Sequence, residues 1–225
     1  MAISKQVLEG IELLIFDLDG TLVDSELDLA LSVNFVLQEM GQKPLSVERI
    51  ASYVGRGVRV LVSRALGPDA TEDDVERGNN LFLDHYCRHM LDHTVPYPGV
   101  REALEGLRGR KMAVLTNKPV KFSRLMLAGL GLTEHFSYIY GGNSFENKKP
   151  DPVGVFQLMG DFDTAAGETL MIGDSVSDVL AGRNAGVWTC GVSYGFGSPT
   201  LKETPPDLII GDLRELPRLL DGKPE

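Results

Sequence analysis

Short apolar runs that end abruptly at polar or glycine residues recur along this chain and predict the strands of a buried sheet. Each run is continuous rather than alternating, as is typical of parallel strands that are covered on both faces. The runs cover residues 12–16, 111–116, 169–173, 187–192 and 207–210, with a weaker one at 137–140.

Helical patterns of about ten residues separate most of these runs. They cover residues 100–107, 120–130, 153–161, 176–185 and 213–220. Strands that alternate with helices predict an α/β fold with a doubly wound, Rossmann-like parallel sheet and helices on both faces.

Residues 25–97 interrupt this rhythm, because they contain helical spacing of apolar residues and no strand pattern. Three helical segments are expected there, the third over about residues 72–91, and Pro96 and Pro98 end the block. We therefore predict a core domain made of residues 1–24 and 98–225, with an inserted helical domain over residues 25–97.

Composition is that of a folded globular protein, with 43% hydrophobic and 24% charged residues among 225. The net charge of −10 disfavours nucleic acid and anionic membranes as partners. Two cysteines without a C-x-x-C pattern, and the lack of a signal-peptide or membrane-spanning pattern, predict a cytoplasmic protein. The sequence does not distinguish a monomer from a homodimer.

Two carboxylates follow the first predicted strand directly, in residues 17–21 (DLDGT). Alternation along an extended chain turns Asp17 and Asp19 to the same side, and ligands of doubly wound sheets bind beyond the carboxyl ends of the strands. Such close carboxylates repel each other unless a cation lies between them or one is protonated. The alternative is a simple turn, because Asp, Gly and Thr all favour turns.

A second acidic pair lies in residues 173–178 (GDSVSD), which follow another apolar run and begin a predicted helix. Asp174 and Asp178 are four residues apart and share a helical face if the helix has begun at the first of them. The pair is either a metal site or, equally well, a helix cap formed by Asp174.

Candidate phosphate ligands occur in two further loops. Thr116 and Asn117 follow a strand and precede a proline that is suited to a helix start, where a hydroxyl and free backbone N–H groups can bind a phosphate oxygen. A cap or turn explains them as well. Lys149 lies in a proline-flanked loop, where a lysine is more often a solvated surface charge.

In combination, these motifs resemble the four active-site motifs of the haloacid dehalogenase (HAD) superfamily of phosphohydrolases. The inserted helical segment resembles the α-helical cap of that family, and the resemblance covers essentially the whole chain. Residues 16–25 (FDLDGTLVDS), 116–119 (TNKP) and 191–197 (GVSYGFG) further resemble its bacterial phosphoglycolate phosphatase branch.

The resemblance implies hydrolysis of a small-molecule phosphate ester, above all 2-phosphoglycolate, through an aspartyl-phosphate. It implies that Asp17 is the nucleophile and that Asp19 is the general acid and then the general base. It also implies that Thr116, the backbone N–H of Asn117 and Lys149 hold the phosphoryl oxygens.

Charge balance favours a bound cation at such a site. Asp17, Asp174 and Asp178 carry −3 and a phosphate monoester about −2, so these groups would repel one another strongly in a partly dry site. Mg²⁺ and Lys149 return +3, and hard oxygen ligands favour Mg²⁺ over zinc. The resemblance implies that Asp17, the backbone carbonyl of Asp19 and Asp174 bind Mg²⁺, with Asp178 in support.

The inserted domain offers two further candidates. Arg56, within Gly-Arg-Gly, could bind a substrate carboxylate, although an arginine there is more often solvated. His85, His89 and His93 recur every four residues on the third predicted helix, which permits a zinc site. The more common interpretation is three histidines without a metal.

Competing functions remain open at this point. A sugar phosphomutase of the β-phosphoglucomutase type has the same four motifs and retains the phosphoryl group, and other phosphatases act on sugar phosphates, nucleotides or pyrophosphate. A response-regulator receiver also has an acidic cluster, a Thr and a Lys on a parallel sheet. Receivers, however, are shorter and lack both the Asp-x-Asp pair and the helical insertion.

Overall fold

A six-stranded parallel sheet forms the core of this protein in a computed structural model that describes residues 8–221. The strand order is β5-β4-β1-β6-β7-β8, and every neighbouring pair is parallel. The predicted α/β fold is therefore confirmed. The strands are β1 (Leu13–Phe16), β4 (Lys111–Leu115), β5 (Tyr138–Tyr140), β6 (Thr169–Gly173), β7 (Trp188–Val192) and β8 (Leu208–Ile210).

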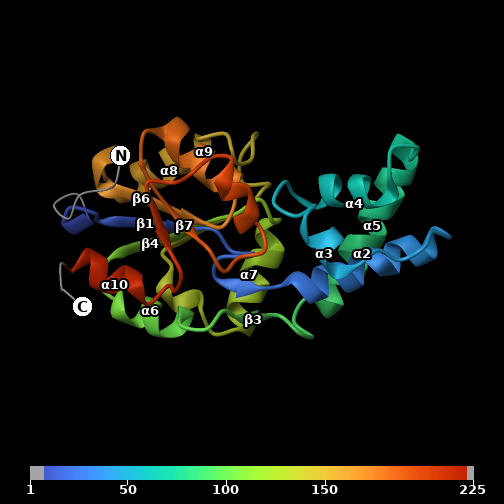
Figure 1. Cartoon of the computed structure of the whole chain (residues 1–225), viewed down its shortest axis with the longest axis horizontal. Helices are drawn as coiled ribbons and strands as arrows, with labels where there is room; N and C mark the ends of the chain where they lie inside the picture. The colour runs from blue at the N-terminus through green and yellow to red at the C-terminus, as the bar shows by residue number, and fades with distance from the viewer. Residues whose placement is uncertain (1–7, 222–225) are drawn as a thin grey trace.

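Helices cover both faces of this sheet, as Figure 1 shows. Because side chains alternate along a strand, Leu13 and Ile15 pack with α8 and α9, whereas Leu14 and Phe16 pack with α6, α7 and α10. The helices are α6 (Val100–Gly106), α7 (Val120–Gly129), α8 (Val153–Phe162), α9 (Val176–Ala185) and α10 (Glu215–Leu220). Short 3₁₀ turns occur at η1 (Thr133–His135), η2 (Ala166–Glu168) and η3 (Ser198–Lys202).

The helical insertion lies to one side of the sheet (Figure 1). It contains α2 (Glu26–Glu39), α3 (Val47–Ala51), α4 (Val58–Leu66) and α5 (Glu72–His89). The short helix α3 was not expected from the sequence, because five residues are too few to show a period of 3.6. No helix within residues 8–221 is both long and apolar enough to cross a membrane.

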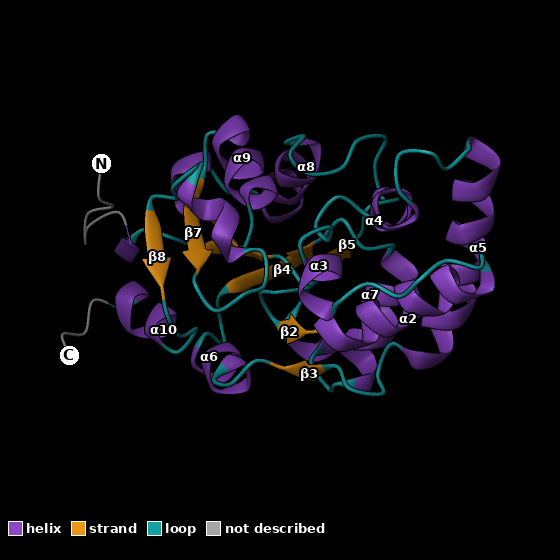
Figure 2. Cartoon of the chain, turned by 45° about the vertical axis from the view of Figure 1, so that its right-hand side comes forward, coloured by secondary structure: helices purple, strands orange, loops and turns teal. Residues whose placement is uncertain are grey.

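A two-stranded antiparallel ribbon connects the insertion to the sheet (Figure 2). It pairs β2 (Val23–Asp24) with β3 (Val95–Pro96) and was not expected from the sequence. The predicted division into residues 1–24 and 98–225 on one side and 25–97 on the other falls at this ribbon. We keep that division as a proposal and call residues 25–97 the cap.

Asp28 fastens the two ends of the cap together at the ribbon. Its carboxylate is 1% exposed and accepts hydrogen bonds from the Thr94 backbone N–H at 2.8 Å, the Thr94 hydroxyl at 2.7 Å and the His93 backbone N–H at 3.0 Å. Burial acts to raise the pKa of Asp28, but these hydrogen bonds outweigh it and lower the pKa below its ordinary value.

Replacement of Asp28 should destabilise the protein strongly. Asp28→Ala leaves buried donors of Thr94 and His93 without an acceptor, and we expect the free energy of unfolding at pH 7 to fall by about 3 kcal/mol. Because the native pKa is lowered, this contribution should persist above the ordinary Asp pKa of 3.8 and disappear in more acidic solution. Urea unfolding at pH 7 and below pH 3 measures both effects.

Asp92→Ala is the matched control, because Asp92 is exposed and accepts a hydrogen bond from the exposed His89. Its loss should change the free energy of unfolding by less than about 0.5 kcal/mol. Equal losses in the two variants would contradict the special role of Asp28.

Candidate active site

The candidate site residues gather where three neighbouring strands end. Asp17 follows β1, Thr116 follows β4 and Asp174 follows β6, and β4, β1 and β6 are adjacent in the sheet. Because parallel strands end on the same edge, loops that are far apart in sequence meet there. The sheet therefore brings together the segments that the sequence singled out.

An acidic cluster forms the floor of the site. Carboxylate oxygens of Asp17, Asp174 and Asp178 all lie within 4.8 Å of one another, and all three residues are buried. Lys149 lies among them, with its ammonium 2.9 Å from Asp17 Oδ1 and 2.6 Å from Asp178 Oδ1. The Lys149 side chain is only 2% exposed, so this lysine is not the solvated surface charge that its loop composition favours.

Burial makes the negative charge in this cluster unfavourable. It raises the pKa of Asp17 to about 6, and nearby Asp178 adds to the shift while Lys149 opposes it. The pKa of Asp174 is also raised well above its ordinary value, by burial and then by Asp178 and Asp17. Burial alone would lower the pKa of Lys149, but Asp17 and Asp178 outweigh it and raise this pKa.

Two glycine loops close around Asp174. Gly20 has a φ of +82°, and a Cβ atom at this position would lie 2.0 Å from Asp174 Oδ2. The backbone N–H of Gly197 donates a hydrogen bond of 2.7 Å to the same oxygen. Glycine is therefore required at position 20 for both its conformation and its contact.

The donor set of the cluster fits Mg²⁺. It offers three carboxylates and no sulfur or imidazole, which is the chemistry that Mg²⁺ prefers. Within residues 8–221, this is the sole group of three closely spaced acidic, histidine or cysteine ligands. Asp178, expected as a supporting residue, lies among these carboxylates and also pairs with Lys149.

Asp19 lies beside the cluster, and its carboxylate contacts Lys118. Lys118 donates to Asp19 Oδ1 at 2.9 Å and to Oδ2 at 3.0 Å, and the Ser25 hydroxyl donates to Oδ1 at 2.6 Å. Lys118 also donates to the Tyr86 hydroxyl of α5 at 2.7 Å. Sequence reasoning missed Lys118, although its place two residues after Thr116 at a strand end was a usable signal.

Thr116 and Asn117 both lie in the site, with different contacts. Thr116 is 3% exposed, and its hydroxyl accepts a hydrogen bond of 3.3 Å from the Lys118 backbone N–H. The Asn117 side-chain amide donates to the carbonyls of Gly55 in the cap at 2.7 Å and of Lys149 at 2.9 Å. Asn117 therefore connects the cap to the loop that carries Lys149.

A cavity of about 50 Å³ lies between the cap and the site. Asp17, Asp19, Thr116 and Asp174 line it from the core, and apolar side chains of α2, α4 and α5 line it from the cap. Arg56 is exposed and is not part of this lining, although its neighbours Gly55 and Gly57 are. In this arrangement Arg56 does not reach the cavity, so its expected contact with substrate stays a prediction.

The comparisons with known proteins agree with this geometry. Residues 14–192 match the family of haloacid dehalogenase-like hydrolases. The phosphoglycolate phosphatase of Pseudomonas fluorescens (strain Pf0-1) is 44% identical over 224 residues, which cover 95% of this chain and 81% of that protein. The phosphoglycolate phosphatase of Vibrio parahaemolyticus is 41% identical over 220 residues, covering 92% of this chain and 95% of that protein.

This chain belongs to the haloacid dehalogenase-like hydrolases. The resemblance inferred from the sequence is thereby confirmed. A solved structure described as a predicted phosphoglycolate phosphatase from Haemophilus somnus 129pt has a TM-score of 0.87 at 33% identity, covering 92% of this chain and 96% of that one. A putative phosphoglycolate phosphatase from Lactobacillus delbrueckii also has a TM-score of 0.87, at 27% identity, covering 94% and 99%.

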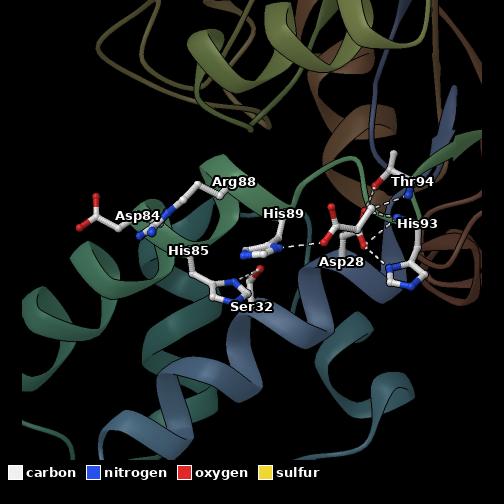
Figure 3. A network of polar contacts seen from close by, with 9 residues as sticks. Asp28, Ser32, Asp84, His85, Arg88, His89, His93 and Thr94 are labelled. Atoms are coloured by element: carbon white, nitrogen blue, oxygen red, sulfur yellow. Dashed lines mark hydrogen bonds and ion pairs between the residues drawn. The ribbon is translucent and has the colours of Figure 1, made fainter.

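The cap histidines of this HAD hydrolase do not share one helical face (Figure 3). Helix α5 ends at His89, so the expectation that it carries His93 as well was wrong. His85 Nδ1 lies 3.0 Å from the Ser32 hydroxyl, whereas His93 Nδ1 lies 2.8 Å from Asp28 Oδ1. Among the described residues, none of these histidines belongs to a closely spaced group of three ligands.

The acidic cluster of this HAD hydrolase should lower its stability in the absence of metal. Burial raises the pKa of Asp17 from 3.8 to about 6 in the folded protein, so folding favours the protonated carboxyl over the charged one. This contribution to the free energy of unfolding is complete below pH 3.8 and is lost as the pH rises through 6. Asp17→Asn removes the buried charge, so in chelator at pH 8 its free energy of unfolding should exceed that of the unmutated protein by about 2 to 3 kcal/mol. At pH 4 the difference should nearly vanish.

Urea unfolding in EDTA at the two pH values measures this difference. Asp69→Asn is the control, because Asp69 is exposed and lies in a loop of the cap, and it should change stability little at either pH. An Asp17→Asn variant that is less stable than the unmutated protein at pH 8 would contradict the interpretation.

Proposed function

We propose that this protein is a Mg²⁺-dependent phosphatase that hydrolyses small phosphate monoesters, with 2-phosphoglycolate as the preferred substrate. The observation that carries the proposal is the buried cluster of Asp17, Asp174 and Asp178 with Lys149 at the strand ends, beside Asp19. The names of the relatives support the choice of 2-phosphoglycolate.

Asp17 and Asp174 would hold Mg²⁺ through their carboxylates, together with the backbone carbonyl of Asp19, and Asp178 would support them. Mg²⁺ supplies positive charge that lets these carboxylates share the site with a phosphate dianion. The same charge offsets the unfavourable burial that raises the pKa values of Asp17 and Asp174.

Asp17 is the nucleophile in this proposal. One carboxylate oxygen forms a bond to phosphorus as the bond between phosphorus and the leaving alkoxide oxygen breaks, which gives an aspartyl-phosphate. Lys149 holds the other side of this carboxylate through its 2.9 Å contact with Oδ1 and fixes the orientation of the group. A fixed nucleophile lowers the entropic part of the barrier.

Asp19 moves the proton in both steps. It first donates a proton to the leaving alkoxide and becomes a carboxylate. It then takes a proton from water, whose oxygen attacks phosphorus and releases phosphate and the Asp17 carboxylate. The hydroxyl of Ser25, 2.6 Å from Oδ1, and the ammonium of Lys118 hold Asp19 in place for both transfers.

Thr116, the Asn117 backbone N–H and Lys149 would bind the transferring phosphoryl oxygens. Thr116 lines the cavity, and Lys149 would bring the positive charge that stabilises oxygens as negative charge develops on them. The contact of the Asn117 side chain with Gly55 links this binding to the position of the cap.

The position of the cap over the site favours a small substrate in this proposal. The cavity is lined by Asp17, Asp19 and Thr116 from the core and by apolar side chains of the cap, so a substrate must fit between the two. A cap that has to move to admit and release substrate suits small molecules such as 2-phosphoglycolate.

Phosphate release from a substrate panel tests the proposal. We expect Mg²⁺-dependent release from 2-phosphoglycolate, with a higher kcat/KM than for hexose phosphates and nucleotides, and loss of activity on chelation. Asp17→Asn should abolish turnover, because no carboxylate is left to attack phosphorus. Asp19→Asn should lower kcat by about 10²- to 10⁴-fold, the usual contribution of a positioned acid and base.

Three outcomes would contradict the proposal or its assignment of the nucleophile. Isomerisation of a hexose 1-phosphate without phosphate release would identify a mutase instead. Rapid-quench mass spectrometry that finds trapped phosphate on a residue other than Asp17, or turnover by Asp17→Asn, would refute the assignment of the nucleophile.

A further inference from the structure

Positive charge is scarce in the wall of the active-site cavity. Within residues 8–221, Lys118 is the one lysine or arginine that lines it. Lys149 forms ion pairs with Asp17 and Asp178 in the acidic cluster, and its side chain is 2% exposed. The rest of the wall beyond Asp19 is largely apolar and includes Leu29, Val58, Leu61, Phe82, Phe122 and Phe196.

The ammonium of Lys118 is held between the core and the cap. It contacts both oxygens of Asp19 at 2.9 and 3.0 Å, the Tyr86 hydroxyl at 2.7 Å, and the Tyr86 ring at 4.5 Å from its centre. The Lys118 side chain is 4% exposed and Tyr86 is 1% exposed. A buried charge held by so many contacts occupies a defined position.

Tyr86 can contribute a second hydrogen bond at this position. Burial, followed by the negative charges of Asp19 and Asp28, raises the pKa of Tyr86 well above its ordinary value, so its hydroxyl stays protonated. This hydroxyl accepts from Lys118 and retains its own proton to donate. Lys118 and Tyr86 therefore present adjacent donors to the cavity.

We propose that Lys118 and Tyr86 bind the carboxylate of the leaving group and thereby select phosphate esters that carry a second negative charge next to the ester oxygen. This inference rests on the proposed function, because it assigns Asp19 to the ester oxygen. It names Lys118 as the residue that determines specificity, a role that the sequence had suggested for Arg56.

Covalent connectivity supports this assignment. Asp19 must lie within hydrogen-bond reach of the ester oxygen in order to protonate it, and Lys118 lies within hydrogen-bond reach of Asp19. In 2-phosphoglycolate a single methylene separates the ester oxygen from the carboxyl carbon. A carboxylate so close to the oxygen that Asp19 contacts falls within reach of the Lys118 ammonium, and it would take over one of the three donors that Asp19 and Tyr86 accept in this structure.

Other nearby cations are placed less well for this role. Arg56 and Lys148 are exposed and do not line the cavity, and Arg59 pairs with Glu72 on the cap. Because the wall beyond Asp19 is largely apolar, an anionic leaving group would find no other cation among the lining residues of the described chain, 8–221, to compensate for its desolvation. A leaving group with a hydroxyl in place of the carboxylate could not form the charge-assisted hydrogen bond with Lys118.

Two substrates of similar size test the inference: 2-phosphoglycolate and 2-hydroxyethyl phosphate, which lacks the carboxylate. The measured quantity is the ratio of their kcat/KM values. A change in Lys118 that only alters the acid–base function of Asp19 should slow both substrates equally, so it cancels in this ratio. We expect Lys118→Met to lower the ratio about 10- to 100-fold, as for loss of a charge-assisted hydrogen bond, and Lys118→Arg to keep most of it.

Tyr86→Phe should lower the same ratio by a few-fold, because it removes one donor and leaves the charge of Lys118 in place. Glycolate should inhibit the unmutated enzyme competitively and bind more weakly to Lys118→Met by a similar factor. Lys121→Met is the matched control: Lys121 is an exposed cation on α7, three residues away, and its loss should leave the ratio unchanged.

The outcomes separate this inference from the proposed function. If the unmutated enzyme releases phosphate from neither substrate, the proposed function fails. If it hydrolyses 2-phosphoglycolate but Lys118→Met slows both substrates equally, the inference is overturned and the proposed function stands. An unmutated enzyme with no preference between the two substrates also overturns the inference. If Lys118→Met does not fold, Lys118→Gln replaces it, because a glutamine side chain can still donate a hydrogen bond to Asp19.

Discussion

Negative charge concentrated among buried side chains is the constraint on which this candidate active site depends. Asp17, Asp174 and Asp178 converge within 4.8 Å, and burial raises the pKa values of Asp17 and Asp174. Lys149 compensates only part of this charge. On the proposed function, a bound cation would offset this excess charge, and the destabilisation that we predict without metal would contribute to the affinity for the cation.

Consecutive residues after β4 join this charged site to the cap. Asn117 donates to the carbonyl of Gly55, and Lys118 connects Asp19 to Tyr86. Because these contacts involve both the cap and the core, they form only when the cap lies over the site. In this arrangement the position of the cap is thus coupled to the orientation of Asp19, the proposed acid.

Much of the fold followed from periodicity in the sequence. Continuous apolar runs predicted the six strands, and intervening patterns predicted α6 to α10 to within a few residues. Local burial was enough for these elements, because each strand of a parallel sheet is covered on both faces. Periodicity did not reveal α3 or the β2–β3 ribbon, which are too short to show a repeat and are fixed by tertiary contacts such as those of Asp28.

The sequence by itself determined which loops carry the candidate site residues, since Asp17, Thr116 and Asp174 each follow a predicted strand. The packing of the cap on the core decided which cation faces the cavity. It buried Lys118 beside Asp19 and left Arg56 exposed, although both are basic residues in loops that precede a helix. Sequence patterns record local burial along one element, whereas the direction of a loop side chain depends on contacts with residues distant in the chain.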